Sequence, residues 1–277
     1  MVRCSRFALL LSFSICSFAA DQPSPPPIQD NSFLIEEAYN QEPGVIQEIS
    51  TLARFWNSKD WICTFTQEWP APADWRHQLS YTVAWQHAGA FPQSGSGLGD
   101  LLLNYRFQLL GSGETRVAFS PRMSLIFSTG DGSKGRSLGG TGVQTNLPLS
   151  VVIFPKLVTH WNLGATIVPH ATNPVGVHAS TYGYNLGQSF IWLAKPGFNA
   201  LLETSYSRFQ AVAAPGQTQW LPCFYVSPGV RWAYNLRNGL QIVPGIALPM
   251  GVGPSHGEKG VFLYLSFEHP YRSIARK

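Results

Sequence analysis

The sequence predicts an all-β fold: an antiparallel up-and-down transmembrane β-barrel of about twelve strands, preceded by a short N-terminal helical segment. Three observations favour this fold class. The chain has few charged residues, its apolar and polar side chains alternate with a period of two, and its connections alternate between short turns and longer loops.

The composition excludes several classes of protein. Charged residues make up 12% and aromatic residues 13% of the 277 residues, whereas soluble domains carry about 25% charged residues. A mean hydropathy of -0.02 and the lack of an apolar run near the ~20 residues of a spanning helix exclude a helical membrane protein. A net charge of +4 without a basic cluster excludes a nucleic-acid partner. Two classes remain: a secreted all-β protein and an outer-membrane barrel.

The N-terminus reads as an export signal. Arg3 and Arg6 precede an almost wholly apolar stretch that ends near Phe18, and cleavage after Ala19 is expected. Only Cys63 and Cys223 follow the signal, so no disulfide framework holds the fold together. The predicted divisions are a signal peptide (1–19), a Pro-rich linker with a short helix (20–44), the barrel (45–269) and a C-terminal tail (270–277).

The helix is expected over residues 32–39, where Asp30 or Asn31 could cap it and two glutamates lie early in the helix. Pro43 and Gly44 would end it. The sequence leaves two roles open for this segment, a plug inside the lumen or a periplasmic tether.

The alternation predicts two distinct faces on each strand. Between residues 100 and 109, Leu101, Leu103, Tyr105 and Phe107 share one face, and the other carries Asp100, Asn104 and Arg106. In a barrel of this class the apolar face meets lipid and the polar face lines the lumen. Similar alternation recurs along about twelve segments between residues 45 and 269.

The connections sort by length. One end has short links, such as residues 155–156 and 195–197, and the other has longer ones, including 129–141, 169–179 and 210–217. Short periplasmic turns and longer external loops are typical of outer-membrane barrels. Tryptophans near the strand ends predict two interfacial belts, with Trp61, Trp85 and Trp220 near the long loops and Trp69, Trp192 and Trp232 near the short turns.

The stretch from Gly97 to Arg106 (GLGDLLLNYR) resembles an early strand of the outer-membrane transporter family named after the meta-pathway of phenol degradation. The turn Gly111-Ser112-Gly113 and the strand end Ser128-Thr129-Gly130 are also similar. The resemblance covers about residues 60 to 269. It implies a Gram-negative outer-membrane barrel that moves small organic compounds.

No catalytic, metal-binding or cofactor-binding motif is recognisable, so the chain is predicted to be neither an enzyme nor a cofactor carrier. His170 and His178 lack acidic or cysteine partners in the sequence around them. Ser150 and His160 lie in polar phase on neighbouring predicted strands, which leaves a barrel-embedded lipid-modifying enzyme as one alternative. The other alternative is a secreted, soluble β-sandwich with an adhesive or binding role.

The remaining candidates are charged residues in luminal phase. They are Asp100, Arg106, Arg116, Arg122, Glu203 and Arg231. Two interpretations stay open: these residues pair with one another and fill the barrel, or the arginines form a constriction that favours anions. Glu203 is the expected partner of Arg122 across the lumen. The predicted function is a channel for passive passage of small organic solutes, including aromatic or anionic ones. Its expected partners are outer-membrane lipid and the outer-membrane assembly machinery, and its oligomeric state stays open.

Overall fold

The computed structural model describes residue 28 and residues 31–70, 74–89 and 95–270. These residues form a closed antiparallel barrel of twelve strands, which confirms the fold class predicted from the sequence. The barrel closes because β1 (Val45–Phe55) pairs with both β2 (Trp61–Pro70) and β17 (Gly260–Pro270). In the described part of the chain, no helix is long and apolar enough to cross a membrane.

Interruptions divide five of the twelve strands in two, so seventeen segments are numbered. The other segments are β3 (His77–Ala88), β4 (Gly95–Leu98), β5 (Leu101–Phe107), β6 (Val117–Phe119), β7 (Arg122–Phe127), β8 (Gly142–Asn146), β9 (Leu149–Phe154), β10 (Leu157–Thr172), β11 (His178–Lys195), β12 (Phe198–Ala214), β13 (Gln217–Trp232), β14 (Tyr234–Asn235), β15 (Gln241–Ala247) and β16 (Met250–Gly251). Two short 3₁₀ helices, η1 (Gly132–Lys134) and η2 (Gly253–Ser255), lie in loops.

The strand phase agrees with the alternation in the sequence. On β5, Leu103 and Tyr105 are 45% and 40% exposed, whereas the neighbouring Asn104 and Arg106 are 7% and 3% exposed. Apolar side chains therefore cover the outside of the barrel, and polar ones point inward. Because the strands close on themselves, each backbone finds its hydrogen-bond partners in two neighbouring strands.

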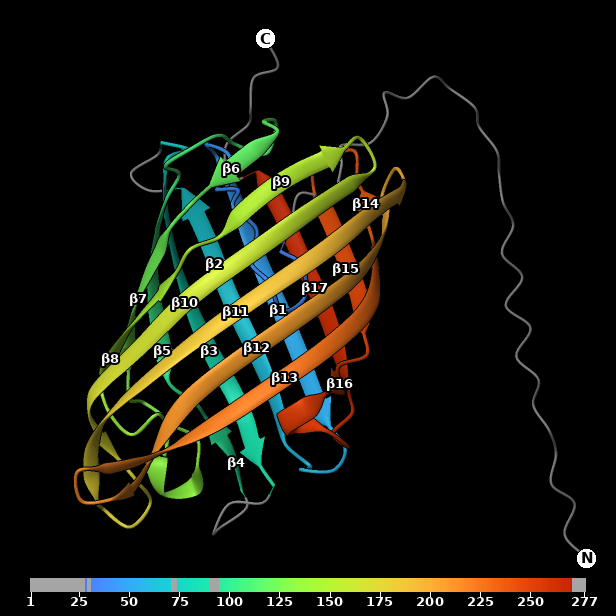
Figure 1. The fold of residues 1–277 in the computed structure, drawn as a ribbon. Helices are drawn as coiled ribbons and strands as arrows, with labels where there is room; N and C mark the ends of the chain where they lie inside the picture. The colour runs from blue at the N-terminus through green and yellow to red at the C-terminus, as the bar shows by residue number, and fades with distance from the viewer. Residues whose placement is uncertain (1–27, 29–30, 71–73, 90–94, 271–277) are drawn as a thin grey trace, which may run out of the picture.

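The two ends of the barrel differ, as Figure 1 shows: β6, β9 and β14 lie at one end, and β4 and β16 at the other. We call the first the short-turn end and the second the long-loop end. The long strands β10 to β13 cross the barrel obliquely between them. Residues 155–156 and 196–197 form two-residue connections at the short-turn end.

Two of the long loops predicted from the sequence are wrong. Strands β10 and β11 continue through most of residues 169–179, where Ala171 pairs with Ala179. Strands β12 and β13 continue through most of residues 210–217, where Ala214 pairs with Gln217. Gly216 has a φ of 68°, a backbone conformation that lets the chain reverse within two residues. The small and polar residues of these stretches are typical of loops, but here they form the paired ends of long strands.

Candidate functional site: the barrel interior and its inner segment

A stretch of chain before the first strand runs through the barrel interior. We call residues 31–44 the inner segment. Its residues contact inward-facing side chains of β3, β5, β7, β9, β10, β12 and β13. The segment then leaves the interior at the short-turn end, where Val45 begins β1 opposite Pro270.

The inner segment is not helical, so the predicted helix over residues 32–39 is wrong. The backbone amides of Phe33 and Leu34 donate to the Glu203 carboxylate at 2.9 and 3.1 Å. The amide of Glu36 donates to Asn162 Oδ1, and that of Ala38 to Ser150 Oγ, both at 2.8 Å. Wall side chains thus supply the acceptors that a helix would supply from its own carbonyls.

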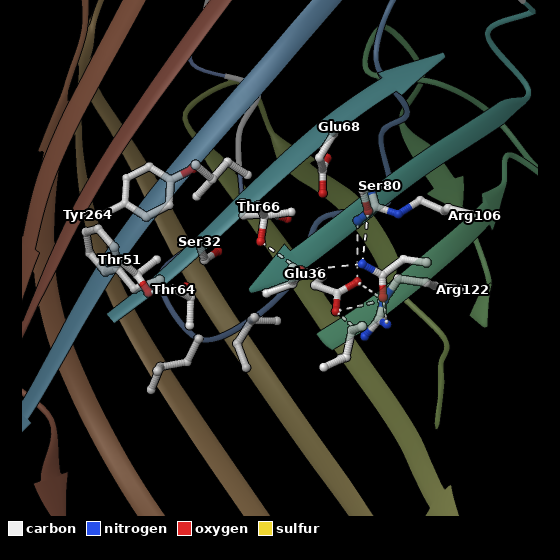
Figure 2. Close-up of a pocket in the computed structure, with 18 residues that line it drawn as sticks. Ser32, Glu36, Thr51, Thr64, Thr66, Glu68, Ser80, Arg106, Arg122 and Tyr264 are labelled. Atoms are coloured by element: carbon white, nitrogen blue, oxygen red, sulfur yellow. Dashed lines mark hydrogen bonds and ion pairs between the residues drawn. The ribbon is translucent and has the colours of Figure 1, made fainter. Parts of the chain in front are cut away.

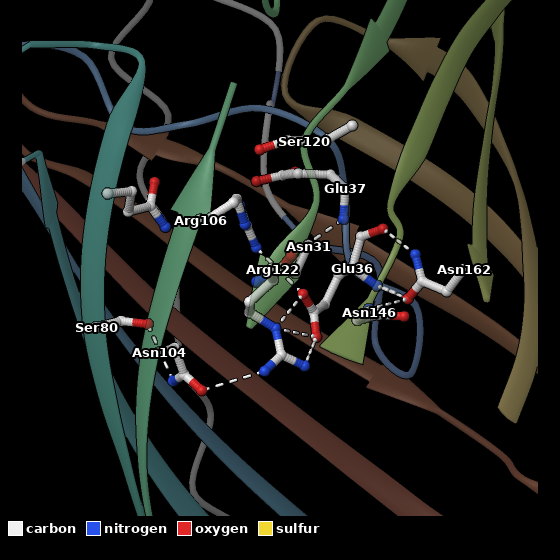
Figure 3. Close-up of polar contacts among 12 residues, drawn as sticks. Asn31, Glu36, Glu37, Ser80, Asn104, Arg106, Ser120, Arg122, Asn146 and Asn162 are labelled. Carbon is white, nitrogen blue, oxygen red and sulfur yellow. Dashed lines mark hydrogen bonds and ion pairs between the residues drawn. The ribbon is translucent and has the colours of Figure 1, made fainter. Parts of the chain in front are cut away.

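Glu36 is the electrostatic centre of the segment. Its carboxylate accepts from Arg122 Nη2 at 2.6 Å and from Arg122 Nε at 2.9 Å. Arg106 Nη2 lies 3.4 Å from the same carboxylate, and Arg106 Nη1 donates to the carbonyl of Tyr39 at 3.1 Å. Figure 3 shows both guanidinium groups pointing toward Glu36 from the wall. Two arginines on adjacent strands therefore form ion pairs with one carboxylate of the inner segment.

Burial by itself would raise the pKa of Glu36. The positive charges of Arg122 and Arg106, together with hydrogen bonds from Arg122 and Asn146, outweigh it and lower the pKa from 4.5 to about 2. The ionised form is thus strongly favoured while the segment is docked.

Apolar packing anchors the opposite side of the segment. The ring of Phe33 lies 5.8 Å from the ring centroids of Phe262 and Tyr264. A Cβ at Gly229 or Gly245 would lie only 2.4 or 2.5 Å from the Phe33 ring. These two inward-facing glycines form the socket that lets the ring approach the wall.

Cavities remain within the described part of the barrel. One, of about 240 Å³, lies between the inner segment and the wall formed by β1, β2, β3 and β5 (Figure 2). A second, of about 340 Å³, lies at the long-loop end beside Asp60, His87 and Glu258. A third, of about 190 Å³, is mainly apolar and lies beside Ile28, Tyr39 and Ile191. The interior is therefore obstructed but not filled.

Four of the predicted luminal residues come together around the inner segment. Arg106 and Arg122 bind Glu36, Glu203 binds the amides of Phe33 and Leu34, and Arg231 donates to the carbonyl of Asn31. Arg106, Glu203 and Arg231 are at most 3% exposed. The expected pairing of Glu203 with Arg122 is wrong, because the inner segment lies between them and supplies each with another partner.

Asp100 and Arg116 lie away from this cluster. The carboxylate of Asp100 accepts from the amides of Gly130 and Leu138 at 3.1 and 2.8 Å, which fixes a loop at the long-loop end. Arg116 is exposed at the short-turn end, where its Nε donates to the carbonyl of Val152 at 3.3 Å. Both therefore contact loop or strand backbone and not the inner segment.

The six tryptophans of the predicted belts lie at the strand ends where the sequence placed them. Trp61, Trp85 and Trp220 are near the long-loop end, and Trp69, Trp192 and Trp232 are near the short-turn end. All six have the outward phase, and Trp85 and Trp192 are 49% and 57% exposed. Their role at lipid interfaces stays a prediction.

Ser150 and His160 do pair across β9 and β10, and both side chains contact the inner segment. Ser150 Oγ accepts the amide of Ala38, and His160 packs its ring edge-on to Tyr39 at 5.7 Å. Among the residues that the structure describes, no three His, Cys, Asp or Glu side chains gather where they could hold a metal ion.

Sequence reasoning missed two parts of the interior. Arg136 folds back from a loop and is only 8% exposed; its guanidinium lies 2.8 Å from where a Cβ of Gly97 would be. The stretch Gly95–Leu98 forms β4, and its glycines leave room on the inner face for that side chain. The second part is a row of inward threonines on β1, β2 and β3, whose only signal was their common phase.

No protein-family profile matches the sequence, and no match was found among curated proteins. Solved structures do resemble the fold. The COG4313 outer membrane channel from Pseudomonas putida F1 superposes with a TM-score of 0.59 at 12% identity, over 84% of this chain and 97% of that chain. The NanC porin superposes with a TM-score of 0.52 at 9% identity, over 80% of this chain and 98% of that chain. The fold is thus that of porin-like outer-membrane barrels.

Proposed function

We propose that this protein is an outer-membrane channel for the passive passage of small organic solutes, and that the inner segment closes its lumen. The observation that carries the proposal is the construction of the interior. A closed barrel with an apolar exterior holds a non-helical segment almost entirely through wall side chains, with cavities left beside it.

The contacts of the segment suit reversible docking. Its backbone is held by side chains such as Glu203, Asn162 and Ser150, and not by a strand of the barrel. Releasing the segment would therefore break side-chain contacts while leaving every strand pairing intact. The segment enters β1 at the short-turn end, which we assign to the periplasm because short turns are periplasmic in this class. The tryptophans at both ends fit the two interfaces of a bilayer.

The test is flux through the purified full-length protein in lipid. In planar bilayers and in liposome-swelling assays we expect discrete conductance steps and size-dependent entry of small solutes. The folded protein should also migrate differently in detergent gels before and after boiling, because a closed barrel resists unfolding. A protein that stays soluble without detergent, shows no heat-dependent mobility and passes no solute would favour the secreted β-protein instead.

A further inference from the structure

The 240 Å³ cavity beside the inner segment combines balanced charge with many hydrogen-bonding groups. Four ionisable side chains line it: Glu36, Glu68, Arg106 and Arg122. Two positive charges thus face two negative ones, and both arginines are already engaged by Glu36. A carboxylate entering this space would meet two others without a guanidinium free to pair with it. The electrostatics therefore disfavour an anion.

Neutral donors and acceptors face the same space. The hydroxyls of Thr51 and Thr64 lie 2.6 Å apart, and those of Thr66 and Thr82 lie 2.8 Å apart. Each pair uses one hydroxyl proton internally and leaves the other available to a ligand. Figure 2 shows Thr51, Thr64 and Thr66 around the cavity.

An apolar surface completes the cavity. Leu34 of the inner segment is 36% exposed, and Ile49, Leu102 and Tyr264 also contribute to the lining. A cavity of about 150 Å³ accommodates benzene, so 240 Å³ accommodates one six-membered ring with substituents. A wholly apolar ring would leave the threonine donors unpaired, which is costly in a buried site.

We propose that this cavity is a binding site for one neutral, ring-sized solute that bears several hydroxyl groups, of the size of a hexose or a cyclitol. Hydroxyl groups of the solute pair with the threonine rows, and its C–H faces pack on Leu34 and Tyr264. The site lies beside the inner segment at the obstruction, so it is the position where a passing solute is selected. This inference rests on the proposed channel function and names its solute class.

The test compares binding and passage in the full-length protein. Saturation-transfer NMR measures binding of glucose and myo-inositol, with glucuronate as a ring of similar size that carries a carboxylate. Cyclohexanol, with one hydroxyl, is added as a competitor. Liposome swelling then measures the passage of glucose and glucuronate. We expect glucose and myo-inositol to bind, glucuronate to bind and pass at least several-fold less well, and cyclohexanol to compete poorly.

The double variant Thr66→Val/Thr82→Val removes one hydroxyl pair while keeping side-chain shape. We expect about a tenfold loss of affinity for myo-inositol, equivalent to about 1.4 kcal/mol. Thr181→Val is the matched control, because Thr181 is buried on the inner face of β11 and does not line the cavity. Heat-dependent gel mobility checks that both variants fold.

The outcomes separate the two proposals. Three results with vesicles that swell would show that the solute class is wrong while the channel function stands. These are that neither polyol binds, that glucuronate or cyclohexanol binds as well as myo-inositol, or that Thr66→Val/Thr82→Val binds myo-inositol as Thr181→Val does. If no solute enters the vesicles while myo-inositol binds with the expected variant pattern, the channel function fails and the binding site stands.

Discussion

Replacing Glu36 with glutamine should release the inner segment from the barrel wall. In the docked state the pKa of Glu36 falls from 4.5 to about 2. Each pKa unit corresponds to about 1.4 kcal/mol, so ionisation of this carboxylate stabilises docking by about 3 kcal/mol at neutral pH. Glutamine keeps one oxygen to accept from Arg122, so we expect a loss of about 2–3 kcal/mol. That loss raises the undocked population by about 30- to 150-fold.

Two measurements report this change. Hydrogen exchange at the amides of Phe33, Leu34 and Glu36 should accelerate by the same factor, because those amides are protected by the wall side chains of the docked state. Conductance of the variant in planar bilayers should rise relative to wild type. Glu42→Gln is the matched control, because Glu42 belongs to the same segment but is exposed.

The reasoning is refuted if Glu36→Gln and Glu42→Gln give the same exchange rates and the same conductance while both remain heat-modifiable barrels. A double-mutant cycle with Arg122→Gln sharpens the result. If the ion pair carries the effect, the second substitution should add much less on the Glu36→Gln background than it costs alone.

Further predictions concern pH, the lipid-facing surface and the turns. Because docking lowers the pKa of Glu36, its contribution should be complete above about pH 4.5 and fade as the pH falls toward about 2; segment amide exchange against pH checks this. Leu103 lies on the outer face and is 45% exposed, so Leu103→Arg should cost about 2–4 kcal/mol in lipid. Thr64 faces the 240 Å³ cavity, so Thr64→Arg should give a higher yield of folded barrel. Equal folded yields on unboiled gels would contradict the strand phase. Gly111→Ala should cost more than Gly216→Ala, although both have positive φ, because a Cβ at 111 lies 2.1 Å from the Val117 carbonyl oxygen and one at 216 meets nothing within 4 Å; denaturant unfolding in detergent checks the order.

The outward and inward faces of the strands could be predicted because they depend on local alternation. Leu103 and Asn104 differ by one position, and that parity decides whether a side chain meets the exterior or the lumen in any closed barrel. The turns were harder. Strand pairing shortened the connections to five residues at 173–177 and two residues at 215–216, and that pairing depends on residues far from the turn itself.

The candidate site was only half predictable. The alternation of side chains along each strand predicted that four residues face the lumen: Arg106, Arg122, Glu203 and Arg231. It did not predict which partner each of them binds. Those partners are 70 to 200 positions away along the chain. Glu36 looked like a helix residue because its neighbours have the spacing of a capped helix.

By itself, the sequence determined a twelve-stranded barrel, the face on which each strand residue lies and the ends at which the tryptophans gather. These properties follow from a two-residue period and from the need to pair every backbone group. Only the tertiary structure decided what fills the lumen. The amides of Phe33, Leu34, Glu36 and Ala38 bind Glu203, Asn162 and Ser150 in place of helical carbonyls. That exchange is favourable only where a closed wall brings those side chains together around the segment.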